Sequence, residues 1–241
     1  MKLYCICCGV FRKELDSLAP DSGHQLRIEY LELGEHARPN TLRCKLQEKI
    51  DAATGCDAVL LGYGLCGTAT AGLVARNVPL VLARSHDCCG ILLGSRRRFE
   101  EIFRPMPSTP FASIGFVDSG DYYFSDGELM IGDSYAKLVE QYGEEDAAYI
   151  REAMRPKLDG KPCPLYFIHT LPAPEAVDEC RRKAESEGRE FRELDGDLRL
   201  LRMLISGEWP EEEFLVINPG ETVFQVGDWD QIIRSGASPS R

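Results

Sequence analysis

The chain has 241 residues, of which 44% are hydrophobic and 28% are charged, and its formal net charge is −11. Such a composition buries a substantial core and fits one large α/β domain or two smaller halves. The negative charge argues against nucleic acid as a partner, because phosphates would be repelled. No apolar run reaches the roughly 20 residues that span a bilayer, and the first residues lack a secretion signal, so we expect no membrane contact and a cytoplasmic location.

Strand and helix patterns alternate through the first hundred residues. Buried apolar runs are followed by glycine turns and then by apolar stripes with helical spacing. This alternation predicts a mostly parallel sheet with helices on both faces. We expect strands at 3–7, 26–33, 57–61 and 78–83, and helices at 10–18, 39–55 and 67–75.

A proline-rich break at 105–110 follows a basic helix expected at 95–103, and we place a boundary there. The last third then repeats the opening rhythm, which predicts a second half-Rossmann unit. Its strands are expected at 165–169, 190–194 and 214–218, and its helices at 174–187 and 197–205. The predicted fold is therefore α/β, with two Rossmann-like lobes (1–106 and 107–234), a cleft between them and a disordered tail at 235–241.

Ten cysteines are more than an ordinary chain carries, but a reducing cytoplasm disfavours disulfides. Three of them, Cys8, Cys66 and Cys88, come where predicted strands end in turns. The other cysteines, apart from Cys89, are interpreted as small apolar side chains. These six are Cys5, Cys7, Cys44, Cys56, Cys163 and Cys180.

The strand order decides whether the three thiols meet. In a flavodoxin-like sheet, the second strand lies outside the first, while the first, third and fourth are neighbours. Cys8, Cys66 and Cys88 follow the first, third and fourth strands, and His86 lies in the same turn as Cys88. Neighbouring strands are about 4.8 Å apart, so side chains from three strand ends can reach one ion. We therefore expect Cys8, Cys66, His86 and Cys88 to be metal ligands.

A glycine turn surrounds Cys66 and supplies the candidate cofactor contacts, which are Gly62, Tyr63, Gly64, Gly67 and Arg84. Glycines permit close approach of the backbone, and a helix starting near residue 67 would favour the thiolate at Cys66. The spacing matches G-x-G-x-x-G, but after the third strand rather than the first, which argues against a dinucleotide. Tyr63 is a core aromatic or a substrate platform, and His169 is an ordinary side chain or one that faces the cleft.

Several stretches resemble an uncharacterised family, domain of unknown function 1638. They are Cys8–Val10 with Glu14, Leu60–Gly67, Pro79–Leu82, Arg84–Cys88 and Leu92–Ser95, with weaker similarity at 142–145 and 196–201. No established reaction attaches to this family. Because some of its members occur beside corrinoid-dependent methyltransferase components, the resemblance implies a corrinoid system as one partner. The doubled thiol Cys88-Cys89 departs from the pattern and leaves the ligand identity of that turn open.

Three functions fit these residues. The leading hypothesis is a metal-binding protein that holds zinc or an iron–sulfur cluster and acts on a small-molecule substrate or serves corrinoid-dependent methyl transfer. The second is a metal-free enzyme with Cys66 as nucleophile and His86 as base, oriented by Asp87. The third is a non-catalytic module that binds a small ligand. A homodimer is the default assembly for each.

Overall fold

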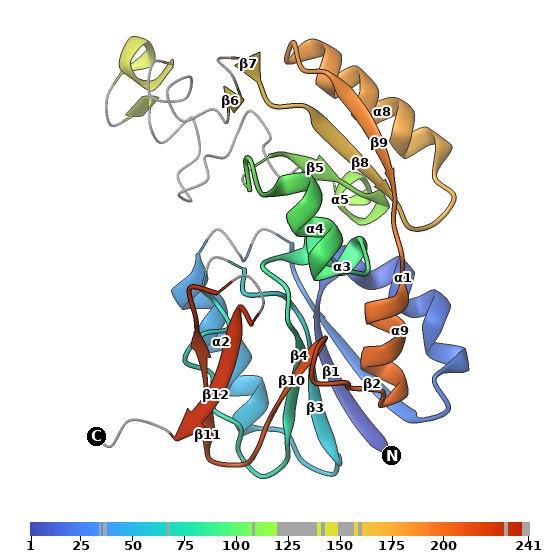
Figure 1. Cartoon of the computed structure of the whole chain (residues 1–241), viewed down its shortest axis with the longest axis vertical. Helices are drawn as coiled ribbons and strands as arrows, with labels where there is room; N and C mark the ends of the chain where they lie inside the picture. The colour runs from blue at the N-terminus through green and yellow to red at the C-terminus, as the bar shows by residue number, and fades with distance from the viewer. Residues whose placement is uncertain are drawn as a thin grey trace. The chain divides into compact units, whose positions relative to one another are not determined.

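The computed structural model describes the chain except for residues 34, 36–37, 67, 108, 120–138, 141–142, 149–156, 159–160, 229–230 and 238–241. Packing divides the chain into two units, residues 1–101 with 196–241, and residues 102–195. Each unit contains a sheet and helices (Figure 1), and the predicted α/β class with mostly parallel sheets is confirmed. Within the described residues, no helix is long and apolar enough to cross a bilayer.

The first unit is built on a five-stranded sheet with the order β10-β4-β3-β1-β2. The strands β1 to β4 are parallel, and β10 is antiparallel to β4. Their bounds are Lys2–Cys8 for β1, Gln25–Leu31 for β2, Ala58–Gly62 for β3, Leu80–Ala83 for β4 and Phe214–Ile217 for β10. The predicted order is confirmed for the four parallel strands, so β1, β3 and β4 are neighbours.

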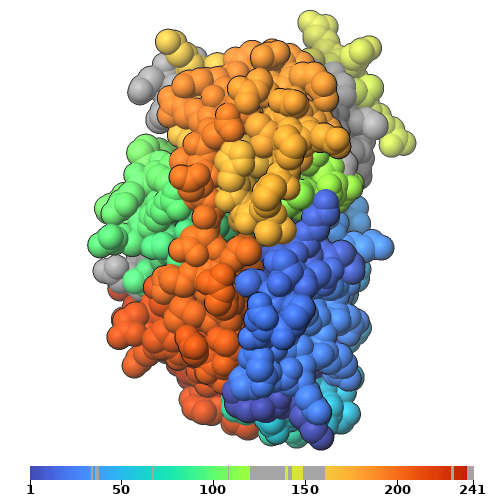
Figure 2. Space-filling view, turned by 90° about the vertical axis from the view of Figure 1, so that its right-hand side faces the viewer, coloured from blue at the N-terminus to red at the C-terminus, as the bar shows by residue number. Residues whose placement is uncertain are grey.

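Helices cover both faces of this sheet. On one face, α2 (Pro39–Asp51) begins with a proline in its first turn and buries Leu42, Leu46 and Ile50, which recur every fourth residue. On the other face, α1 (Arg12–Leu18) and α9 (Arg199–Ser206) lie in contact, and Figure 2 shows them side by side in blue and orange-red. Both faces of the sheet are thus closed to water, as parallel strands require.

Four short helical segments complete the first half of this unit. They are the 3₁₀ turns Gly9–Phe11 and Ala19–Asp21 and the helices α3 (Cys88–Leu92) and α4 (Arg96–Phe103). Of these, α3 begins shortly after β4. Asp87 caps its start by accepting a hydrogen bond from the backbone N–H of Gly90. This cap fixes the direction in which the Cys88 turn leaves the sheet.

The prediction that the strand at 214–218 belongs to a second lobe is wrong. β10 completes the first sheet, where Phe214, Leu215 and Ile217 are buried against β4. The chain returns to the first sheet because the buried strand β4 would otherwise expose an apolar edge. A hairpin of β11 (Glu221–Gln225) and β12 (Ile233–Ala237) follows, so residues 235–237 are a strand rather than part of a tail. Residues 238–241 lie outside the described chain.

The helix predicted at 67–75 is also wrong. Residues 68–72 form turns, Val74 makes an isolated antiparallel bridge to Thr222, and Thr68 and Gly72 have left-handed φ values of 79° and 88°, which an α-helix excludes. The backbone N–H groups of Gly72 and Ala75 donate to the carbonyls of Val223 and Glu221 at 2.7 and 3.0 Å. Pairing with the distant strand β11 therefore replaces the local hydrogen bonds of a helix.

The second unit has a three-stranded parallel sheet with the order β5-β8-β9. Aromatic pairs fill its core, with Phe103 edge-on to Tyr166 and Phe111 edge-on to Phe116. The strands and helix predicted within 165–194 are confirmed. The elements are β5 (Phe111–Ala112), α5 (Ile114–Asp118), β6 (Lys157–Leu158), β7 (Lys161–Pro162), β8 (Leu165–His169), α8 (Pro174–Ser186) and β9 (Phe191–Asp195).

The ion pair between Glu29 of β2 and Lys49 of α2 makes a pH-dependent contribution to stability. Lys49 and the Tyr4 hydroxyl both donate to Glu29, and they lower the pKa of this carboxyl. A lowered pKa in the folded state stabilises the fold above the unfolded pKa of about 4.3, and the contribution is lost as the pH falls through the folded value. We expect Glu29→Gln to lower the free energy of unfolding at neutral pH by about 0.5 kcal/mol, since the carboxylate is partly exposed.

Urea denaturation at pH 7 and near pH 3 measures this effect, and the difference between Glu29→Gln and the parent should vanish at the acid end. The exposed Glu32 provides the matched control, and Glu32→Gln should leave stability unchanged at both pH values. An equal loss in Glu29→Gln at both pH values would show that the effect is not ionic.

Candidate functional site

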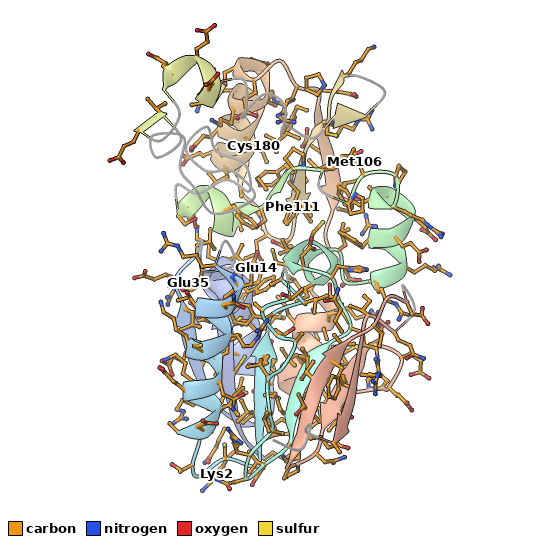
Figure 3. The ribbon with its side chains drawn as sticks, turned by 90° about the vertical axis from the view of Figure 1, so that its left-hand side faces the viewer. Lys2, Glu14, Glu35, Met106, Phe111 and Cys180 are labelled. Carbon is orange, nitrogen blue, oxygen red and sulfur yellow. The ribbon has the colours of Figure 1, made fainter. Side chains whose placement is uncertain are left out.

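The carboxyl edge of the first sheet gathers the strand ends that carry the predicted ligands. Cys8 is the last residue of β1, Cys66 lies in the loop after β3, and Cys88 begins α3 after β4. Figure 3 shows Glu14 and Glu35 at this same end of the unit, while Lys2 marks the opposite, amino edge of β1. In parallel sheets of this kind, ligands bind at the carboxyl edge.

Backbone hydrogen bonds tie the β3 loop to the β4 loop. The N–H of Leu65 donates to the carbonyl of Ser85 at 2.8 Å, and the N–H of Cys66 donates to the carbonyl of His86 at 2.9 Å. These bonds continue the β3–β4 pairing past the ends of the strands. The residues Cys66 and Cys88 are therefore held in two loops that run side by side.

Two of the predicted glycines have a packing role. A Cβ atom on Gly64 would lie 2.7 Å from the backbone N and Cα of Asp87, and one on Gly62 would lie 2.2 Å from the Sγ of Cys7. Only hydrogen fits in either place. Close contact between the two loops, and between β3 and β1, explains these glycines without a bound nucleotide. Gly67 lies outside the described residues.

The backbone at Cys66 is in a conformation that side chains rarely adopt. Cys66 has φ = 46° and Thr68 has φ = 79°, both in the left-handed region, and Thr68 is β-branched. Arg43 donates to the carbonyl of Thr68 at 2.8 Å and so helps to hold this turn. Non-glycine residues in this region cost free energy and cluster at functional sites, so the turn is a candidate for function.

The three thiols lie within electrostatic reach of one another. Burial raises the pKa of Cys66, and the charges of Cys8 and Asp87 raise it further, whereas a hydrogen bond from the Gly64 backbone opposes this effect. Burial also raises the pKa of Cys88, as do the charges of Asp87, Cys66 and Cys8. The expectation that a helix start favours the Cys66 thiolate is therefore wrong, because the described residues 68–72 form turns rather than a helix and burial raises the pKa of the thiol.

His86 and Asp87 lie in the β4 loop, where burial changes the pKa of both side chains. The ring of His86 packs 5.8 Å from that of Phe99, and burial lowers the pKa of this histidine, which favours the neutral imidazole. Burial raises the pKa of Asp87 to about 6, although the backbone N–H groups of Gly90 and Cys89 bind its carboxylate. Asp87 thus faces the start of α3, where its carboxylate acts as a cap.

Two further residues at this edge carry chemistry: Glu14, which the strand-end pattern did not single out, and Tyr63, which was a candidate cofactor contact. Glu14 is fully buried, and its charge raises the pKa of Cys7. Tyr63 is only 2% exposed, and its hydroxyl lies near enough to Cys8 and Cys66 for their charges to raise its pKa. For Glu14, the one signal in the sequence was its place in the first stretch of the family resemblance.

The structure gives Arg84 backbone partners. Its guanidinium donates to the carbonyls of Glu211 at 2.8 Å, Gln231 at 3.0 Å and Ile233 at 2.5 Å. These three bonds join the end of β4 to the segments before β10 and around β12. Arg84, predicted as a cofactor contact, thereby has a structural role.

His169, which was predicted to be an ordinary side chain or one that faces the cleft, belongs to the second unit. Its ring Nε2 lies 2.9 Å from Oε2 of Glu193.

The two adjacent cysteines, Cys88 and Cys89, differ in burial. Cys89, the second residue of α3, is fully buried, whereas Cys88 is half-buried at the sheet edge. Of the pair, only Cys88 is therefore partly exposed. In the part of the chain that the structure describes, no group of three or more histidine, cysteine, aspartate or glutamate side chains is close enough to hold a metal ion.

A family model described as "Protein of unknown function (DUF1638)" matches residues 30–205. The chain belongs to this family. The DUF1638 match includes Cys66, His86 and Cys88, while Cys8 lies before it. Comparison with curated proteins and with solved structures gives no match.

Proposed function

We propose that this DUF1638 protein binds a soft metal centre, zinc or an iron–sulfur cluster, through the thiolates of Cys8, Cys66 and Cys88. His86 is the fourth ligand. The observation that carries the proposal is the strand order β4-β3-β1, which brings the ends of all three thiol-bearing segments to one edge. Thiolate and imidazole are the donors that zinc and iron–sulfur centres take in proteins.

The charges at this edge support a cation as the occupant. Thiolates at these three positions and the Asp87 carboxylate would repel one another, as their effects on the pKa of Cys88 indicate. A bound cation would neutralise this repulsion, and thiols that coordinate a metal lose their protons. The neutral form of His86 is the one that ligates metal.

The proposal requires the ligands to move when the metal binds. The described side chains form no ready-made metal group, so the thiols must change rotamer and the Cys66 turn must adjust. Metal binding commonly orders its own site in this way, since the binding free energy pays for the rearrangement. The left-handed turn at Cys66 and Thr68 is where we expect this adjustment.

The same observations disfavour a metal-free nucleophile. A reactive cysteine needs a lowered pKa, usually beside a cation or a helix start. Cys66 has neither, because its surroundings raise its pKa and its charged neighbours are Cys8 and Asp87. The Asp87 carboxylate accepts hydrogen bonds from backbone N–H groups of α3, and this capping role competes with orienting a base.

The test is the metal content of protein purified anaerobically, without a chelator and without a metal-affinity step. We expect about one zinc ion or one cluster per chain, and we expect Cys66→Ser to lower the content by at least about tenfold. Elemental analysis gives the metal, and ultraviolet-visible spectra distinguish a colourless zinc site from a coloured iron–sulfur cluster.

The matched control is Cys44→Ser, which makes the same chemical change at an exposed cysteine of α2 and should leave the metal content unchanged. Cys8→Ser and Cys88→Ser should behave like Cys66→Ser. A parent protein without stoichiometric metal, or equal metal content in Cys66→Ser and the parent, would refute the proposal.

A further inference from the structure

The strand β2 forms an open edge of the first sheet. Among the described residues, β1 is the one strand that pairs with it. The N–H of Gln25 donates to the carbonyl of Met1 at 3.0 Å, so the main-chain groups of Gln25 point toward β1. Because these groups alternate in direction along a strand, those of Leu26, Ile28 and Tyr30 point outward. Such an edge is a template for another strand.

One face of β2 carries two opposite charges. Arg27 lies opposite Tyr4 of β1, and Glu29 lies opposite Ile6, so both are on the face of the apolar cluster that contains Tyr4, Ile6 and the buried residues of α2. Arg27 is exposed, and the Glu29 side chain keeps 43% of its surface exposed although Lys49 binds it. A cation and an anion thus stand two residues apart on an accessible part of the edge.

The other face of β2 carries a row of apolar side chains. Leu26, Ile28 and Tyr30 alternate with the two charged residues, and all three are half-buried. Tyr30 is held in place there, since its hydroxyl donates to Oδ1 of Asp16 in α1 at 2.7 Å. Further burial of this row would remove apolar surface from water, which favours association.

We propose that β2 pairs antiparallel with β2 of a second copy of this chain, about a twofold axis at Ile28. In this register Ile28 faces its own copy, Leu26 faces Tyr30 of the partner subunit, and Arg27 faces Glu29 of the partner subunit. The outward main-chain groups form the ladder, and two cross-strand ion pairs form where opposed Cα atoms are about 4.5 Å apart. The two five-stranded sheets then join into one continuous sheet, independently of the proposed metal centre.

The charges select this register. The twofold axis must pass through a residue whose main-chain groups point outward. Moving it from Ile28 two residues toward the start of β2 would place Arg27 opposite Gln25, and moving it two residues the other way would place Glu29 opposite Leu31. Both shifts lose the ion pairs. With the axis at Ile28, the edge is complementary to itself, as a twofold interface requires.

The first experiment measures the mass of the full chain by sedimentation equilibrium at about 100 µM, well above a micromolar dissociation constant. The parent should have twice the chain mass of 26.9 kDa. Arg27→Glu and Glu29→Arg, each checked for folding by circular dichroism, should each weaken the dimer by about 100-fold, because like charges then face each other in both pairs. An equimolar mixture of the two variants should form heterodimers, because opposite charges face each other again.

The matched control is Arg97→Glu, which makes the same change of charge at an exposed arginine of α4 and should leave the mass at that of the parent. A monomeric parent would overturn the proposal. Single variants that dimerise like the parent, or folded single variants whose mixture stays monomeric, would overturn it as well.

Cysteine cross-linking tests the register without the charge variants. Opposed residues of a hydrogen-bonded antiparallel pair have Cα atoms about 5.5 Å apart, within the range of a disulfide, so Ile28→Cys should form a covalent dimer under air with copper phenanthroline. Leu26→Cys is the control on the same face, because its two copies would be about 14 Å apart. Cross-linking of Ile28→Cys no greater than that of Leu26→Cys or of the parent would refute the twofold axis at Ile28.

Discussion

Replacing Gly64 by alanine is expected to destabilise the protein by about 3 kcal/mol, because the new methyl group would overlap backbone atoms that have no room to move. The Cβ would lie 2.7 Å from the N and Cα of Asp87 and 2.9 Å from its carbonyl carbon. Rotation of a side chain cannot relieve this contact. The loops would have to separate, which would break the hydrogen bond between the Cys66 N–H and the His86 carbonyl.

Urea denaturation followed by circular dichroism measures this loss. Gly227 offers a matched control, since a Cβ there meets nothing within 4 Å and its φ is not in the left-handed region. We expect Gly227→Ala to change stability by less than about 0.5 kcal/mol. A Gly64→Ala variant within about 1 kcal/mol of the parent would show that the two loops are not held together as described.

The second large effect is expected at Arg84. Replacing it by methionine keeps the aliphatic stem but removes the donors to the carbonyls of Glu211, Gln231 and Ile233. Hydrogen bonds to a charged group contribute about 1.5–3 kcal/mol each, and partial exposure reduces this. We expect Arg84→Met to lower the free energy of unfolding by about 3 kcal/mol.

The control for Arg84 is Arg97→Met, which removes an exposed arginine with one ion-pair partner, Glu101, and should cost less than about 0.5 kcal/mol. Metal content provides the second readout. If Arg84 is structural, folded Arg84→Met retains its metal. Unchanged stability together with weakened ligand binding would instead support the role in cofactor binding that the sequence suggested.

The candidate site shows how far local patterns reach. Cys8, Cys66 and Cys88 were placed at strand ends by apolar runs and glycine turns, and the rule for strand order then made their strands neighbours. That order is confirmed. The electrostatics were not predictable, because the pKa of Cys66 depends on its burial and on the nearby charges of Cys8 and Asp87. Burial of that kind is a property of the packed core.

The errors share one physical cause. The segment 68–75 has small residues with acceptable helix propensity, yet β11 satisfies its backbone from far along the chain. The strand β10 was predicted correctly as a strand, but its partner was not, since apolar strands with similar sequences can pair with any exposed apolar edge. Tertiary hydrogen bonding decided both cases against the local preference.

The sequence by itself determined the α/β class, the four parallel strands, the helices that follow the first two of them, and the thiols at the strand ends, because these follow from hydrophobic period and turn residues. Only the tertiary structure decided that β10 closes the first sheet, that Arg84 holds the C-terminal segments, and that the Tyr63 hydroxyl is buried without a hydrogen-bond partner among the described residues. Each of these depends on contacts between residues far apart in the chain, and no local pattern encodes such contacts.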